Sequence, residues 1–361
     1  MKDQKKQNEQ NQELSAQKEQ TRHNDSGWDG ELHKKGLNMK QWAVLAVVFI
    51  CLICAGVFWV CQQHRKNAAA IRSGGDIPDN ESSKIITYDG KSYVYNNKLK
   101  TVLFMGVDSR EEATVQEYSG MSGQSDTLLV LILNKESKTT DLLAISRNSM
   151  VELQLYSIDG EYVTTTTGQI ALQYAYGDGE KKSCRLTKEA VSNLLYGIPI
   201  DAYVSLNLDG IVSLVSAFGG IEYTFTEDET EIDPEFTKGT TLLMDGAKTE
   251  RYVRYRDITV TGSNEQRMKR QFKFLRSIFS QVKKKADSDS KMYDILLDSV
   301  EPYMVTDMTA EEIKVLSDYD MSDTMNVVPG KIQQGEKYDE YIVDDEELYR
   351  LILELFYVPA E

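Results

Sequence analysis

Three apolar runs near the middle of the chain predict β-strands, and each of them has charged residues at one end. The runs and their charged neighbours are Thr101–Val107 before Asp108 and Arg110, Thr127–Asn134 after Asp126, and Asp141–Ile145 before Arg147. Four polar residues, 135–138, separate the second run from the third. This length is common in hairpins, so these two strands should pair antiparallel. If Asn134 faces Thr139, an unbulged ladder places Asp126 opposite Arg147 at one end of the sheet.

This pairing allows two interpretations. A cross-strand ion pair would stabilise the sheet by about 0.2–1 kcal/mol and needs no ligand. A site would need further charged groups at the same sheet end, and Asp108 or Arg110 would supply them if the first strand ran alongside the third. Because an acid at a sheet end should contribute little to the core, we expect replacement of Asp126 to leave the protein folded.

A second basic segment lies at residues 252–256. Its alternation of apolar and basic side chains predicts a strand with Arg254 and Arg256 on one face, and the same alternation sends Arg251 to the other face. Two arginines on one strand face repel each other unless an anion lies between them. We therefore expect Arg254 and Arg256 to contact an anionic ligand.

A helix should follow, opening at Arg267. Its buried stripe has helical spacing and consists of Met268, Phe272, Leu275, Phe279 and Val282. Arg267 and Gln271 share one flank of this helix, and the free N–H groups of a first turn suit a phosphate. Arginine binds phosphate oxygens in a bidentate way, with about 1.5–3 kcal/mol for each charge-assisted bond. A solvated helix face is the alternative explanation for Arg267 and Arg270.

The remaining periodic segments predict further α/β structure. The expected elements are a strand at 203–208, a helix at 211–218 capped by Asp209 and ended by Gly219 and Gly220, a strand at 221–225, a helix at 309–316 capped by Thr309 with Glu312, a strand at 325–328 and a helix at 345–356. Val212, Leu214 and Val215 would line a lipid pocket or, as we favour, pack in the core.

The first hundred residues have a different composition. Residues 1–41 are polar and should be disordered, whereas Trp42–Cys61 carries no charge over a length of about 30 Å, enough for one transmembrane helix. We expect a cytoplasmic amino terminus, because the first arm is rich in lysine, and an extracytoplasmic domain. Residues 62–96 would form a linker with a short hairpin at 88–93, and 97–361 the domain, with a carboxy-terminal extension from about 290. A signal peptide cleaved near Ala68–Ala70 is the alternative.

Cysteine, histidine and net charge exclude several functions. Cys184 is the one cysteine after residue 61, so no disulfide can form within the expected domain. All three histidines precede residue 65, which excludes histidine as its catalytic acid or base. A net charge of −16 and a pI of about 4.8 argue against nucleic acid as a partner.

Seven segments, in order, resemble the LytR-CpsA-Psr family. They are LFMGVDSR (103–110), SDTLLVLILN (125–134), LLAISR (142–147), QIALQYAYGDG (169–179), GIPIDAYVSLNLDGIVSLVSAFGGIEY (197–223), LLMDGAKTERYVRYRD (242–257) and RMKRQ (267–271). The family consists of membrane-anchored enzymes that attach lipid-carried glycopolymers, such as teichoic acid or capsule, to the wall of Gram-positive bacteria. The resemblance implies a three-layer α-β-α sandwich with a mixed central sheet and a hydrophobic tunnel for a polyprenyl chain.

The resemblance also implies a site. Asp108 and Asp126 match the family's Mg2+-binding aspartates, an arrangement that suits a cation which shares its ligands with substrate phosphates. The residues that would bind the pyrophosphate are Arg110, Gln124, Arg147, Arg254, Arg256, Arg267 and Gln271, and those that would act in catalysis are Asp108, Asp126 and Arg147.

The sequence departs from the family pattern at four positions. Gln124 stands in place of an arginine, Ser146 of a proline, Asn148 of an aspartate and Gln169 of a lysine. The favoured function is a magnesium-dependent phosphotransferase that moves a glycopolymer from a polyprenyl-pyrophosphate carrier to peptidoglycan or a related wall acceptor. The lost charges favour the alternative, a non-catalytic protein that binds lipid-linked glycans as a scaffold. A regulator of envelope genes is a third possibility.

Overall fold

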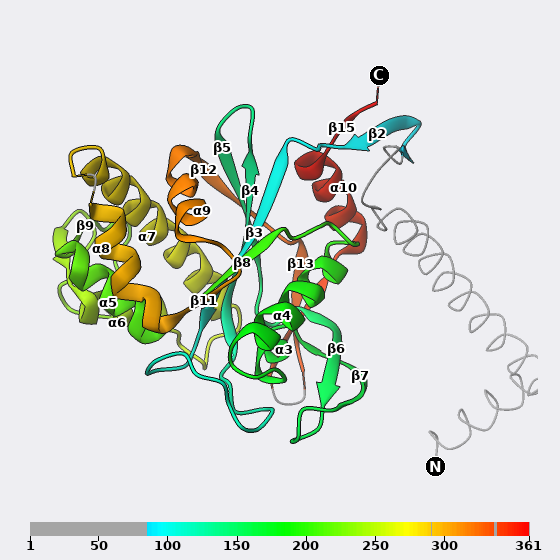
Figure 1. Ribbon diagram of the computed structural model, residues 1–361, viewed down its shortest axis with the longest axis horizontal. Helices are drawn as coiled ribbons and strands as arrows, with labels where there is room; N and C mark the ends of the chain where they lie inside the picture. The colour runs from blue at the N-terminus through cyan, green and yellow to red at the C-terminus, as the bar shows by residue number, and fades with distance from the viewer. Residues whose placement is uncertain (1–84, 290, 336–337, 361) are drawn as a thin grey trace, which may run out of the picture. The chain divides into compact units, whose positions relative to one another are not determined.

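A six-stranded mixed sheet is the centre of the domain in this computed structural model, which describes residues 85–289, 291–335 and 338–360 (Figure 1). The strands, in the order in which they lie across the sheet, are β11 (Met304–Thr306), β8 (Ala202–Asn207), β3 (Leu99–Val107), β4 (Ser125–Asn134), β5 (Thr139–Ile145) and β12 (Asp320–Val327). The pairs β3 with β8 and β5 with β12 are parallel, and the other three neighbouring pairs are antiparallel. The expected mixed sheet is confirmed.

Helices cover both faces of this sheet. Residues 128–133 of β4 are all buried, and alternate side chains join two different cores, as expected for a central strand covered on both faces. One core contains α3 (Leu172–Ala175), α4 (Lys181–Leu194) and α10 (Asp345–Phe356). On the other face are α7 (Ser263–Ala286) and α9 (Ala310–Val315).

A third core lies beside the sheet and holds α7 in place. It joins α7 to α5 (Leu208–Phe218), α6 (Gly246–Arg254), α8 (Met292–Val300) and the ribbon of β9 (Ile221–Thr224) and β10 (Thr241–Met244). Aromatic side chains dominate it: Tyr223 and Tyr252 contact each other, and each contacts Phe225 and Phe274, at ring-centroid distances of 5.1–5.8 Å. Such aromatic pairs add about 0.5–1.5 kcal/mol each beyond area burial. The ends of α6 and α7 nearest the sheet are therefore rigidly placed.

Smaller hairpins complete the domain. They are β1 (Ile86–Tyr88) with β2 (Lys91–Tyr95), β6 (Met150–Tyr156) with β7 (Tyr162–Gln169), and β13 (Gly330–Gln334) with β14 (Asp339–Val343). Strand β15 (Tyr357–Pro359) pairs with β2, so the folded unit includes residues 86–95 of the segment that we expected to be a linker. The expected arm, 1–41, and transmembrane helix, 42–61, lie outside the described residues. None of the helices that the structure describes is long and apolar enough to cross a membrane.

Several predicted elements are confirmed. Asn134 faces Thr139, and the β4–β5 ladder continues without interruption to the pair of Leu128 with Ile145. Helix α10 has the predicted bounds, and Thr309 and Glu312 form the predicted capping box at the start of α9. The hairpin predicted near residues 88–93 is β1–β2.

Other predictions are wrong in their details. The first strand, whose neighbour was left open, runs alongside the second and β8. Residues 252–254 end helix α6, which begins at Gly246 after Asp245 caps it by accepting a hydrogen bond from the Lys248 amide. Helix α7 begins at Ser263, one turn before Arg267, and α5 is capped by the side chain of Asn207, not by that of Asp209.

Candidate functional site

The charged residues predicted from the strand pattern meet at one edge of the central sheet. Because β3 and β8 are parallel and β4 is antiparallel to both β3 and β5, the ends of β3, β5 and β8 lie at the edge where β4 begins. Asp108 follows β3, Asp126 is the second residue of β4, and Arg147 follows β5 by two positions. The register therefore places all three at the same sheet edge.

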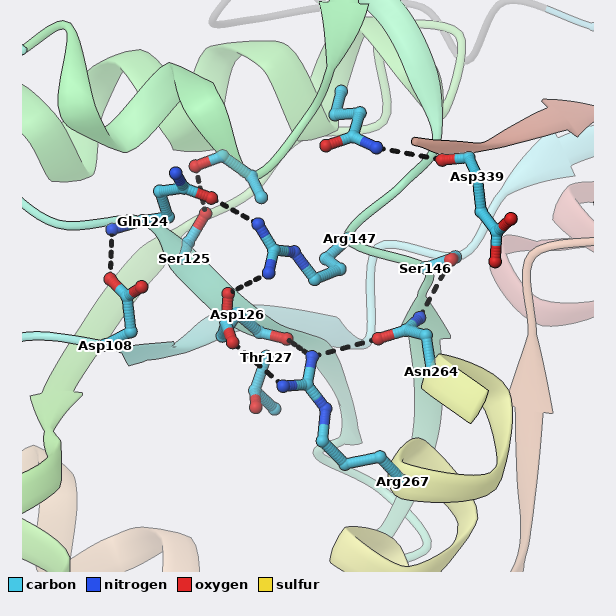
Figure 2. Close-up of polar contacts among 12 residues, drawn as sticks. Asp108, Gln124, Ser125, Asp126, Thr127, Ser146, Arg147, Asn264, Arg267 and Asp339 are labelled. Atoms are coloured by element: carbon cyan, nitrogen blue, oxygen red, sulfur yellow. Dashed lines mark hydrogen bonds and ion pairs between the residues drawn. The ribbon is translucent and has the colours of Figure 1, made fainter. Parts of the chain in front are cut away.

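Asp126 occupies a β-bulge. Gly106 pairs with Thr127 and Val107 with Ser125, so that Asp126 is the extra residue of β4 on the side of β3. A bulge redirects a side chain and interrupts the pairing. The Asp126 carboxylate lies between two guanidinium groups, with Oδ1 at 2.7 Å from Nη1 of Arg147 and Oδ2 accepting a hydrogen bond of 2.8 Å from Nη1 of Arg267 (Figure 2). The predicted proximity of Asp126 and Arg147 is confirmed.

Arg267 is held in place by a buried network. Its Nη2 donates to the carbonyl of Asp126 at 3.1 Å and to Oδ1 of Asn264 at 2.9 Å, and Nδ2 of Asn264 donates to Oγ of Ser146 at 3.1 Å (Figure 2). Only 5% of the Arg267 side chain is exposed. The alternative of a solvated helix face is therefore wrong for Arg267. Sequence analysis missed Asn264, although its place three residues before Arg267 on a helix would have brought the two side chains together.

Arg270 is also buried, but its contacts are structural. Its Nε donates to the carbonyl of Tyr252 at 2.8 Å, and its Nη2 donates to that of Tyr255. Gln271 acts in the same way through Nε2, which donates to the carbonyl of Val253 at 2.9 Å, and it also accepts from Oγ1 of Thr127 at 3.1 Å. These side chains satisfy carbonyl groups that the end of α6 leaves without helical partners.

Gln124 connects Arg147 to Asp108. Its Oε1 accepts a hydrogen bond from Nη2 of Arg147, and its backbone N–H donates to Oδ1 of Asp108 at 2.5 Å (Figure 2). Burial lowers the pKa of Arg147, Asp126 opposes that shift, and the nearby positive charges of Arg267 and Arg256 add to it. The buried guanidinium of Arg147 is therefore a group that a bound anion would stabilise.

The other predicted arginines differ in their placement. Arg254 lines the same cavity as Asp126, is exposed, and pairs with Glu250 at 3.2 Å. Arg256 is half-buried and close enough to Arg147 to affect its pKa. Arg110 does not line this cavity; it pairs with Asp209 at 2.8 Å and with Glu250 at 2.5 Å, the same glutamate that Arg254 contacts. Its predicted contact with the pyrophosphate stays a prediction.

Two adjoining cavities lie between the sheet and the helices of one face. The first, of about 110 Å³, is lined at its polar end by Asp108, Asp126, Arg254, Arg267 and Gln271. The second, of about 250 Å³, is lined almost wholly by apolar side chains of the sheet and of α5, α7 and α8. The residues common to both are Phe104, Leu206, Ile211, Leu275 and Ile278. A charged site therefore continues into an apolar cavity.

Two of the α5 residues that were expected to line a lipid pocket or to pack in the core have different surroundings. Leu214 lines the apolar cavity, whereas Val215 is fully buried in the core of α5, α6 and α7. Helical geometry gives neighbouring residues different surroundings, so one helix can serve both purposes.

The donor set of the site fits a magnesium ion that takes its other ligands from water or substrate. Asp108 and Asp126 line one cavity, and Oδ1 of Asp126 is buried without a hydrogen bond, since Arg147 approaches it outside hydrogen-bond geometry. Mg2+ is commonly bound by one or two carboxylates together with phosphate oxygens. Among the described residues no group of three or more His, Cys, Asp or Glu could hold a metal ion.

Comparison with known proteins places this geometry in a family. The model of the LytR_cpsA_psr family matches residues 62–351. The polyisoprenyl-teichoic acid–peptidoglycan teichoic acid transferase TagU of Enterococcus faecalis is 31% identical over 272 residues, which cover 72% of this chain and 80% of TagU. Biofilm regulatory protein A of Streptococcus mutans is 33% identical over 233 residues, covering 62% of this chain and 53% of that protein.

A solved structure supports the same assignment of the fold. The structure described as TagT bound to LI-WTA aligns with a TM-score of 0.54 at 21% identity, covering 76% of this chain and 95% of TagT. At that identity the likeness concerns the fold. Together with the family match over most of the chain, it agrees with the arrangement of sheet and helices described above. The chain therefore belongs to the LytR-CpsA-Psr family.

Proposed function

We propose that this chain is a transferase that moves a glycopolymer from a polyprenyl-pyrophosphate carrier to peptidoglycan or a related wall acceptor. The observation that carries the proposal is the continuity between a cavity lined by Arg254 and the buried Arg267 and an apolar cavity. A lipid pyrophosphate has the same two parts, a doubly charged head group and a long apolar chain. The relative from Enterococcus faecalis, named as a teichoic acid transferase, supports the same reaction class.

The arginines would bind the pyrophosphate by exchanging partners. Without a ligand, the single carboxylate of Asp126 pairs with both Arg147 and Arg267 and leaves one positive charge uncompensated. An incoming pyrophosphate competes with this carboxylate for both guanidinium groups, and Arg254 and Arg256 add positive charge from the end of α6. Charge-assisted bonds to phosphate in a water-poor site are worth about 1.5–3 kcal/mol each. Mg2+ held by Asp108 and Asp126 would supply a further positive charge to the phosphate oxygens.

Group transfer would then proceed by substitution at phosphorus. A hydroxyl oxygen of the acceptor forms a bond to the sugar-proximal phosphorus, the bond from that phosphorus to the bridging oxygen breaks, and the hydroxyl loses its proton to solvent. Negative charge grows on the bridging oxygen as polyprenyl phosphate leaves. Cations already held in place stabilise this charge without reorganisation, which is the main source of catalysis in phosphoryl transfer.

The membrane placement rests on the sequence. Residues 42–61 would cross the bilayer once, with the amino terminus in the cytoplasm and the domain outside. Such an anchor would keep the apolar cavity close to a substrate that resides in the same membrane. Digestion of the domain by external protease in intact cells, compared with opened cells, tests the external placement of the domain.

A non-catalytic binding protein is the second candidate. Neutral Gln124, Asn148 and Gln169 favour it, because the family pattern has charged residues at these positions. The experiment that separates the two candidates uses the full chain in detergent with Mg2+, a synthetic polyprenyl-pyrophosphate glycan and a wall acceptor. A transferase releases polyprenyl phosphate and loses this activity when Arg147 is changed to Met. A binding protein retains the lipid without forming product.

A further inference from the structure

A polar groove lies outside the charged site, between the β6–β7 hairpin and helix α4. Its volume is about 310 Å³, and its walls carry Glu152, Gln154, Tyr162 and Thr165 from the hairpin and Glu189 and Asn193 from the helix. None of these residues lines the charged cavity.

The base of this hairpin is bonded to the charged site. The Ala171 amide, two residues after β7, donates to the carbonyl of Arg147 at 3.2 Å, and the Ala171 carbonyl accepts from the Ser125 amide at 3.2 Å. Strand β6 begins three residues after Arg147. A molecule bound along the hairpin would therefore have one end directed to the residues that we assign to the pyrophosphate.

The groove wall is rigid. The buried side-chain amide of Gln173 accepts from the Gln154 backbone N–H at 2.8 Å and donates to the Gln154 carbonyl at 3.1 Å. It thus makes the pair of backbone hydrogen bonds that a residue of a neighbouring strand would make. Near the hairpin tip, Nζ of Lys182 donates to the Gly160 carbonyl at 2.8 Å and lies 4.1 Å from the ring centre of Tyr156. The groove is thus already formed without a ligand, which reduces the entropic cost of binding.

The hairpin presents a polar face to the groove. Glu152 pairs with Thr167, Gln154 with Thr165, and Tyr156 with Tyr162, and directly opposite residues in an antiparallel ladder lie on the same face. This face therefore offers carboxylate, amide, hydroxyl and aromatic groups side by side.

Several of these groups are available to a ligand. The exposed side chains of Glu152, Tyr162, Thr165 and Asn193 make no hydrogen bond or ion pair within the part of the chain that the structure describes. Together they supply both donors and acceptors, as a polyhydroxylated ligand requires. Tyr162 adds an aromatic ring that is 57% exposed, with an apolar face and a polar tip.

Charge decides which kind of saccharide fits. Two carboxylates, Glu152 and Glu189, line the groove, and no lysine or arginine is among its lining residues. The adjoining depression differs, because Lys181, Arg185 and Lys188 line it, and it shares only Glu189 and Asn193 with the groove. A phosphate-bearing polymer would be repelled by the first groove, whereas an uncharged sugar chain would not.

We propose that the groove between β6–β7 and α4 binds an uncharged stretch of the acceptor's saccharide chain. This proposal rests on the proposed transferase function, for which it names the acceptor subsite. The subsite holds the acceptor beside Arg147, and the reacting hydroxyl lies beyond the groove at the sheet edge. Positioning of this kind raises the effective concentration of a nucleophile.

A binding experiment tests the proposal with the full chain in detergent. The probe is the β-1,4-linked tetramer of N-acetylglucosamine, titrated by calorimetry. The changes Tyr162→Ala and Asn193→Ala should each weaken binding at least fivefold, because they remove an aromatic surface and an amide from the groove. The matched control is Asn97→Ala, an exposed asparagine in the turn between β2 and β3 and outside the groove, which should bind the tetramer as the unmodified chain does.

Two results would overturn the proposal. One is the absence of saturable tetramer binding by the unmodified chain, and the other is unchanged binding by both groove variants. Binding of a polyprenyl-pyrophosphate analogue, measured in parallel, should be the same in all four proteins and shows that each variant is folded. Failure of the proposed function would appear differently, as tetramer binding without any binding of the pyrophosphate analogue.

Discussion

Replacement of Asp126 by Asn should reduce both stability and magnesium-dependent binding. The change keeps the size of the side chain and removes its charge. Arg147 and Arg267, of which 13% and 5% of the side chain is exposed, would then lose their common carboxylate. Removing one partner of a buried ion pair costs about 3–5 kcal/mol, because the remaining charge stays buried without compensation. Since Asp126 is 21% exposed, we expect the lower end of this range, about 3 kcal/mol.

This magnitude reverses the expectation from sequence that an acid at the sheet end contributes little. Urea denaturation of the full chain, followed by circular dichroism, measures the free energy of unfolding. The matched control is Asp141→Asn on β5, an acid without an ion pair among the described residues, which should change that free energy by no more than about 0.5 kcal/mol. A second change, Arg147→Met, should restore part of the loss by removing an unpaired charge. A loss below about 1 kcal/mol for Asp126→Asn would refute the reasoning.

Binding gives an independent measurement of the same change. Without Mg2+, Asp126→Asn should bind inorganic pyrophosphate more tightly than the unmodified chain, because the guanidinium groups no longer have a competing carboxylate. With Mg2+, the unmodified chain should gain affinity and the variant should gain much less. Calorimetric titration with and without the metal tests both statements. An equal gain from magnesium in the two proteins would show that Asp126 is not a metal ligand.

Three further changes test other parts of the site. Gln124→Arg should raise turnover if the chain is an enzyme. If the chain is a binding protein, the same change should tighten diphosphate binding without forming product. Turnover and diphosphate binding that both equal those of the unmodified chain would place residue 124 outside the site. Arg251→Ala should lower the free energy of unfolding by about 1–3 kcal/mol, because it leaves a buried aspartate unpaired. Arg254→Ala should instead weaken diphosphate binding, because Arg254 lines the charged cavity. Equal losses of diphosphate binding in the two variants would contradict this. Burial raises the pKa of Cys184 to about 12, so peptide mapping at pH 8 should find its thiol alkylated only after unfolding, and rapid native labelling would be the contrary result.

The parts of the site that could be predicted depend on local periodicity. Strand pairing has a fixed period, and a short polar connection sets the register, so counting from Asn134 and Thr139 was enough to bring Asp126 to Arg147. The capping box at Thr309 was predictable for the same reason, because its two partners are three residues apart.

The parts that could not be predicted depend on distant contacts or on ambiguous short patterns. Five residues at 252–256 alternate like a strand, but the signal for a helix lies earlier, at Asp245, whose side chain caps α6. Arg267 is 141 residues from Asp126 in sequence, and no local pattern indicates which acid it binds. The bulge that redirects Asp126 interrupts only the pairing of β4 with β3, and the β4–β5 ladder, whose register the hairpin sets, has no interruption.

The departures from the family pattern acquire a physical meaning in this structure. A glutamine at position 124 has an acceptor oxygen, which an arginine lacks, and it uses that oxygen to bind Arg147. Gln169 likewise donates to the carbonyl of Asp339 at 2.9 Å, so it ties the start of β14 to the end of β7. These amides replace charge by fixed hydrogen bonds. Two of the remaining positive charges, on the buried Arg147 and Arg267, share the single carboxylate of Asp126, and in the proposed function exchange of that carboxylate for a phosphate is the step on which ligand binding depends.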